Sequence, residues 1–153
     1  TSGTHTNIVT KVATKTAAHI YQGTGSSSGY TLDGVEGPFI ELKPGNTYRF
    51  DQADGTNSGH PLRFYYDAAK VTAYSTGVTT NGTPGSAGAY TQIVVADTTP
   101  HILYYQCSSH AHMGNRIGVN SQVLQGVSFV TSTGTAQSFA SPAFAIAQAV
   151  ALG

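Results

Sequence analysis

Residues 104–114, with the sequence YYQCSSHAHMG, combine three side chains that can bind a metal. Cys107, His110 and Met113 follow a Cys-x-x-His-x-x-Met pattern, and the chain has no other cysteine and no other methionine. A thiolate, an imidazole and a weak thioether suit copper when a second imidazole completes a trigonal set of two His and one Cys. His60 is the candidate for this second imidazole. The pattern therefore predicts a site for one copper ion made by His60, Cys107, His110 and Met113.

Structural roles for the same residues have to be weighed against metal binding. A free cysteine is usually a small buried hydrophobe, and a lone methionine usually fills a core. The two further ligand types beside Cys107 favour the metal site. His112 would point to the other side of an extended loop, so we expect a surface or supporting role for it. Solvated or capping roles are expected for the remaining histidines, His5, His19 and His101.

Length and charge exclude several classes of protein. The chain has 153 residues with 39% hydrophobic content, enough for one domain with a real core. Charged residues make up 9% and the net charge is zero, so there is no basic face for nucleic acid. No apolar run is long enough to span a membrane. A surface so poor in charge is unusual for a soluble monomer, which predicts a subunit that associates with other copies.

No pattern typical of catalysis stands out. There is no Ser-His-Asp arrangement, no glycine-rich phosphate loop and no paired carboxylates, and Asp51, Asp54 and Asp67 are interpreted as turn residues. A copper ion with four protein ligands has no open position for a substrate. We therefore expect no enzyme activity, and a role in electron transfer or in structure.

The elements that must position the ligands are predicted as short strands between turn signals. Apolar alternation, with turns such as Lys43-Pro44-Gly45-Asn46, predicts strands near residues 20–21, 30–32, 38–42, 47–50, 59–66, 90–95, 102–106 and 116–119. Residues 76–89 are expected to be a loop, and helix has room only at 67–74 and at the C-terminal end. This series favours an all-β Greek-key sandwich over residues 17–120.

Two terminal segments flank this predicted sandwich. Residues 1–16 are rich in threonine and are expected to form an extended N-terminal arm with strand character. Residues 121–153 end in an uncharged apolar run and are expected to form a tail for subunit contacts. Because burying each Phe, Ile or Leu is worth roughly 1.5–3 kcal/mol, the tail should cover either its own sheet or a neighbouring copy. We prefer the neighbour, whose sheet edge an extended segment can join.

The ligand order and the predicted strands resemble the cupredoxins. In these small blue-copper sandwiches one His lies early, and a Cys-x-x-His-x-x-Met loop joins the last two strands. The loop length here is similar to that of the amicyanin branch, and an aromatic strand runs into Cys107. The resemblance implies that His60, Cys107, His110 and Met113 hold one copper ion for electron transfer. The sequence departs from the family at Pro61, because the residue after the early His typically donates its N–H to the Cys sulfur and proline has none.

A second resemblance covers nearly the whole predicted sandwich. A domain common in predicted virion structural proteins of marine cyanobacterial phages looks similar to the runs PGNTYRFD (44–51), SGHPLRF (58–64), TGV (76–78) and GTPGSAGAY (82–90) and to the loop 107–114. It implies a capsid decoration, fibre or appendage subunit that forms homo-oligomers and contacts other virion proteins. The charge-poor composition fits such a subunit. The alternative is a secreted or periplasmic blue-copper carrier with a redox partner protein.

Overall fold

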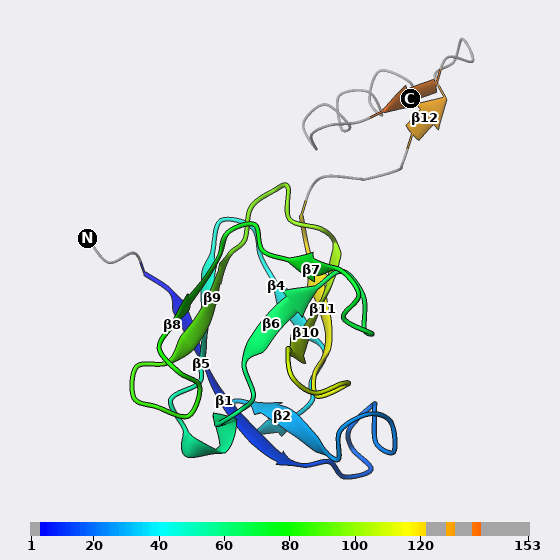
Figure 1. The fold of residues 1–153 in the computed structure, drawn as a ribbon. Coiled ribbons are helices and arrows are strands. Elements are labelled where there is room, and N and C mark those ends of the chain that lie inside the picture. The colour runs from blue at the N-terminus through cyan, green and yellow to red at the C-terminus, as the bar shows by residue number, and fades with distance from the viewer. Residues whose placement is uncertain (1–3, 122–127, 131–135, 139–153) are drawn as a thin grey trace.

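The chain folds mainly into two mixed β-sheets (Figure 1). The computed structural model describes residues 4–121, 128–130 and 136–138. Within these residues the only helix is η1, a short 3-10 turn at Gly55–Asn57. None of the described residues forms a helix that is long and apolar enough to cross a membrane. The predicted all-β class and the β-sandwich character are confirmed, whereas the Greek-key connectivity stays a prediction.

The first sheet has the strand order β3-β2-β1-β5-β9-β8. Its strands in this order are β3 (Val35–Glu36), β2 (Ser28–Leu32), β1 (Thr6–Thr14), β5 (Thr47–Asp51), β9 (Tyr90–Val94) and β8 (Val78–Asn81). The pairing of β1 with β5 is parallel, and the other pairings in this sheet are antiparallel.

The second sheet has the order β4-β11-β10-β6-β7 and contains the strands next to the predicted ligands. These strands are β4 (Ile40–Leu42), β11 (Asn115–Val119), β10 (Ile102–Cys107), β6 (Leu62–Tyr65) and β7 (Ala73–Tyr74). Strands β11 and β4 are parallel, and the remaining pairs are antiparallel. The start of β6 therefore lies beside the end of β10.

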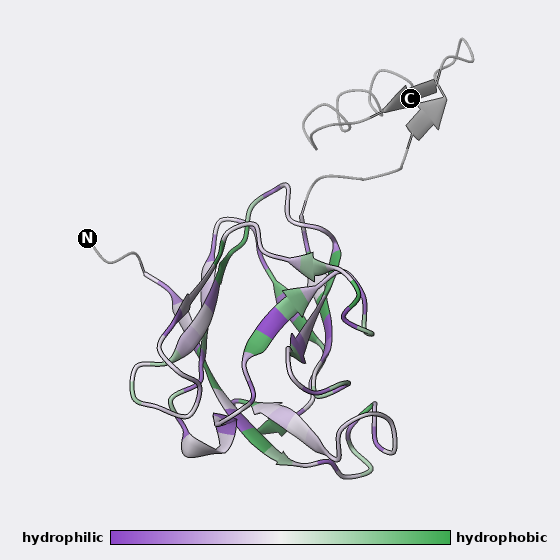
Figure 2. Ribbon diagram, viewed as in Figure 1, coloured by the Kyte–Doolittle hydropathy of each residue, from purple (hydrophilic) through white to green (hydrophobic). Residues whose placement is uncertain are grey.

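The core fills the space between the two sheets with alternate residues from each strand. Along β6, buried Leu62 and Phe64 flank the half-buried Arg63, and Figure 2 shows this change from hydrophobic to hydrophilic and back along the strand. Large side chains from both sheets are fully buried here, including Tyr30, Phe50 and Ile93 from the first and Leu42, Leu103, Tyr105 and Ile117 from the second. Burial of this apolar layer stabilises the packing of the two sheets against each other.

Residues 6–14, predicted as part of an arm, form β1 in the middle of the first sheet. Thr10 is fully buried, and Ile8 and Val12 pack against the core. Strand β1 is hydrogen-bonded on both sides, to β2 and to β5. Residues 6–14 are therefore an internal strand of the sandwich and not a separate arm.

Three local predictions differ from the structure. Residues 78–81 form the edge strand β8, whose mostly exposed residues give no alternation to detect. Residues 67–74 are not helical, because the Asp67 carboxylate accepts N–H bonds from Val71 and Thr72 at 2.8 and 2.9 Å and closes a tight loop before β7. Residues 20–21 form turns instead of a strand.

The predicted tail lies largely outside the described residues. Within it, β12 (Ser128–Val130) and β13 (Ala136–Ser138) pair antiparallel with each other.

Candidate metal centre

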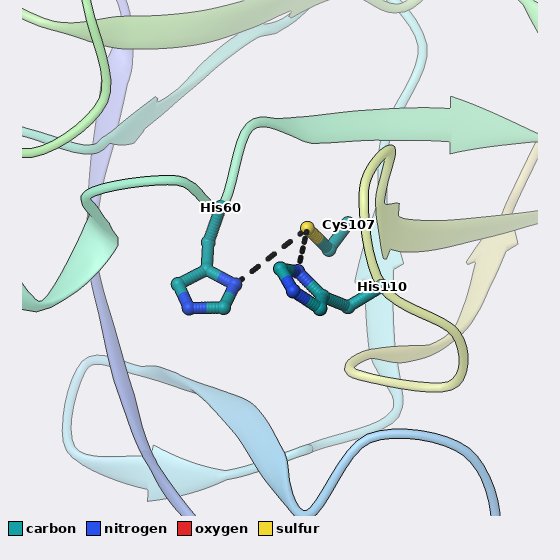
Figure 3. A group of neighbouring side chains, drawn as sticks. All are labelled: His60, Cys107 and His110. Carbon is teal, nitrogen blue, oxygen red and sulfur yellow. Dashed lines mark hydrogen bonds between the residues drawn. The ribbon is translucent and has the colours of Figure 1, made fainter.

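Strand pairing brings together two of the predicted ligands that are 47 positions apart in the sequence. Cys107 is the last residue of β10 and pairs with Leu62, the first residue of β6. His60 stands just before β6, so its side chain reaches the end of β10. His110 comes from the loop that follows Cys107. Figure 3 shows the three side chains pointing toward one another from these separate elements.

The distances in this cluster suit one metal ion. The Cys107 Sγ atom lies 3.8 Å from His60 Nδ1 and 3.6 Å from His110 Nδ1, and the three ligand atoms all lie within 4.8 Å of one another. Bonds of about 2.0 Å to nitrogen and 2.3 Å to sulfur, at a trigonal angle, would place N and S about 3.7 Å apart. The observed separations match this value. His60, Cys107 and His110 are therefore close enough together to hold one metal ion.

Burial differs across the cluster. Cys107 is fully buried, His60 is half-buried and His110 is exposed. Burial, and secondly the neighbouring His110, lower the pKa of His60, so this imidazole is neutral at neutral pH. The neutral ring is the form that binds a metal.

No protein-family model, curated protein or solved structure matches this chain.

Met113, the fourth predicted ligand, is fully buried in the same loop and belongs to the same core cluster as Cys107. Its carbonyl oxygen accepts the Tyr30 N–H at 2.7 Å and lies 3.2 Å from His19 Nε2. The backbone of Met113 is thus held from the first sheet. Its thioether as a distant ligand stays a prediction.

A main-chain N–H group of the ligand loop itself donates a hydrogen bond to the Cys107 sulfur. The Ser109 N–H donates to Cys107 Sγ at 3.4 Å. Pro61 has no N–H, but its carbonyl accepts the Ser108 N–H at 2.9 Å. The residue after His60 therefore ties the ligand loop to β6 through its oxygen.

The backbone of His60 is fixed by two buried side chains. Its carbonyl accepts the Tyr30 hydroxyl and the Gln52 side-chain amide, each at 2.8 Å. The Gln52 oxygen in turn accepts the Leu62 N–H at 2.9 Å. Burial, and secondly the nearby Cys107, raise the pKa of Tyr30 well above its ordinary value, so the phenol keeps its proton and remains a donor.

The ligand loop is closed at its base by Gln106 and Gly114. The buried Gln106 side-chain oxygen accepts the Gly114 N–H at 2.8 Å. A Cβ atom at position 114 would overlap the Tyr105 carbonyl oxygen, so only glycine fits there. Ala111 is held from outside, because its carbonyl accepts the Ser26 N–H at 2.9 Å.

Two further histidines, His112 and His19, lie beside the ligand-loop main chain or within it. The His112 ring lies against Tyr21, with ring centroids 4.8 Å apart. His19, expected to be solvated, is instead 3% exposed and contacts Met113 across 94 positions of sequence. No signal in its local sequence marks this contact, because the partner atom belongs to a distant main chain.

Proposed function

We propose that this chain binds one copper ion and exchanges single electrons through it. His60, Cys107 and His110 are the three close ligands, and Met113 is the distant fourth. The observation that carries the proposal is the pair of N···S separations, 3.6 and 3.8 Å, around a buried thiol. Soft sulfur with two imidazoles is a donor set that copper prefers over magnesium, calcium or manganese.

The protein's contribution is to hold the ligands in place before the metal arrives. Copper supplies the one-electron step when bound. Tyr30 and Gln52 fix the His60 main chain, and the Ser109 N–H faces the Cys107 sulfur. Exposed His110 gives the otherwise buried site an edge that a redox partner can approach. With four protein ligands no substrate position is left, so we propose no enzyme activity.

Titration of the metal-free protein with Cu(II) tests the proposal. We expect one equivalent to bind with an intense blue thiolate-to-copper absorption band, because the Cys107 sulfur is a direct ligand. Cys107→Ser should abolish the band, and His110→Ala should abolish or strongly shift it. The matched control is His112→Ala, on the same loop but against Tyr21, which should keep the band. Failure of the unaltered protein to bind copper stoichiometrically would contradict the proposal.

We further propose that the domain serves as a structural subunit of a phage particle, as decoration, fibre or appendage. The observation that favours this location is the low charge content, 9% of the chain, because interspersed charges normally protect a freely diffusing protein against association. A secreted or periplasmic carrier that docks on a redox protein is the alternative.

A further inference from the structure

Lys70 reaches the ligand loop from the connection between β6 and β7. Its Nζ atom donates to the carbonyl oxygen of Cys107 at 2.9 Å and to that of Ser108 at 3.2 Å. These two residues begin the loop that carries His110. Lys70 stands 37 positions before Cys107, so the contact exists only because β6 and β10 are neighbours.

The backbone at Lys70 adopts a conformation that lysine disfavours. Its φ angle is 63°, in the left-handed region where glycine or asparagine is usual. The surrounding loop fixes this conformation, because the Asp67 carboxylate accepts the N–H groups of Val71 and Thr72. A side chain held on an unfavourable backbone is a reason to look for its use.

The same loop is attached to β10 at a second point. The Gln106 side-chain amide donates to the Ala68 carbonyl at 3.2 Å, while its oxygen holds Gly114. The 67–72 loop thus contacts Gln106, Cys107 and Ser108, where the ligand loop begins. Lys70 is the cationic side chain whose amine donates to the main chain of Cys107.

We propose that Lys70 is a positioning residue for the metal centre, which rests on the proposed copper function. It fixes the main chain of Cys107 and Ser108 with two charge-assisted hydrogen bonds. It also holds a positive charge beside the site. Two neutral imidazoles and one thiolate leave a site charge of +1 with Cu(II) and zero with Cu(I), so a neighbouring cation favours the reduced ion. Lys70 therefore raises the reduction potential.

The experiment compares Lys70→Met, Lys70→Arg and Lys70→Gly with the matched control Lys43→Met. Lys43 is exposed and follows β4, whose last residue Leu42 lies opposite Val119; the Val119 N–H bonds to His101, before the start of β10. Lys43 thus lies near the start of β10, whereas Cys107 is at the end of that strand. The control removes the same charge from the protein without touching the ligand loop.

Two readouts separate the charge of Lys70 from its hydrogen bonds. In the copper-loaded protein, Lys70→Met should lower the reduction potential, with the ratio of Cu(I) to Cu(II) affinity falling roughly tenfold for the loss of one nearby charge. Lys70→Arg should keep most of the potential, and Lys43→Met should leave it unchanged. In the metal-free protein, amide hydrogen exchange at Ser108 and Ser109 should become faster in Lys70→Met and stay the same in Lys43→Met.

Lys70→Gly guards against a variant that fails to fold, since glycine relieves the backbone strain and removes the side chain. It should lower the potential as Lys70→Met does. An unchanged potential together with unchanged amide exchange in both variants would overturn the proposal. If the unaltered protein binds no copper, the charge effect falls with the copper proposal, and the exchange measurement still decides whether Lys70 holds the ligand loop.

Discussion

His19, in the connection between β1 and β2, contacts the ligand loop through its side chain. Its Nδ1 atom accepts the Tyr21 N–H at 3.1 Å, so the ring proton is on Nε2, which faces the Met113 carbonyl at 3.2 Å. Burial is the main cause that lowers the pKa of His19 below its ordinary value of 6.5, and Lys15 adds to it; the Met113 contact and Glu36 act in the opposite direction. The neutral ring is therefore part of the folded state.

This burial predicts a stability that falls at acid pH. Above the ordinary pKa of 6.5 the folded and unfolded chains both carry neutral His19; below it the unfolded chain takes up the proton first. The free energy of unfolding of the metal-free protein should therefore decrease from about pH 7.5 to about pH 5. Urea denaturation at both pH values measures this.

His19→Gln should make that decrease smaller. Part of the decrease should remain, because burial lowers the pKa of His60 as well. An equal pH dependence in His19→Gln and in the unaltered protein would show that His19 keeps its ordinary titration.

At the scale of elements, the connection between β10 and β11 depends on close main-chain contact. Gly114 packs directly on the Tyr105 carbonyl, and its N–H is bonded to Gln106. These contacts set where the loop returns to the sheet. The direction of His110 from the loop therefore depends on a position with no side chain.

Gly114→Ala should destabilise the protein by about 1–3 kcal/mol, because the added methyl group cannot be accommodated without moving β10 or the loop. Denaturant unfolding measures the loss. The control is Gly55→Ala, at an open position without a left-handed backbone, where the change should stay within about 0.5 kcal/mol. Similar small effects at both positions would contradict the tight packing at Gly114.

At the scale of the whole molecule, we expect copper binding and self-association to depend on different parts of the chain. All the site residues and the strands of both sheets lie between Thr6 and Val119, and the Asn120 N–H bonds to Leu42. A chain that ends at Asn120 should therefore fold and bind copper as the full chain does.

The same shortened chain should lose self-association, because residues 121–153 carry the uncharged apolar sequence that we propose for contacts between copies. Light scattering of both chains measures their mass. An oligomer for the full chain and a monomer for the short one are expected. A full chain that is a monomer of 15.8 kDa would instead favour the diffusing carrier, and an assembled short chain would exclude the tail as the connector.

The sequence by itself determined the all-β class and the three residues that meet at the candidate metal site. Alternation along strands such as residues 47–50 and 102–106 is a local signal that survives folding. The types and spacing of Cys107 and His110 are also local, and His60 was chosen among six histidines through the cupredoxin resemblance, in which one His lies early. These features needed no knowledge of which strands are neighbours.

Only the tertiary structure decided what surrounds these ligands. Residues 6–14 became a central strand because both of their neighbours, β2 and β5, are supplied by later parts of the chain. Lys70 and His19 act on main-chain carbonyl groups of residues 107, 108 and 113. Every residue has a carbonyl group, so no side-chain pattern marks these partners. Strand pairing across long sequence separations selects them, which is why the supporting contacts emerge only in the folded chain.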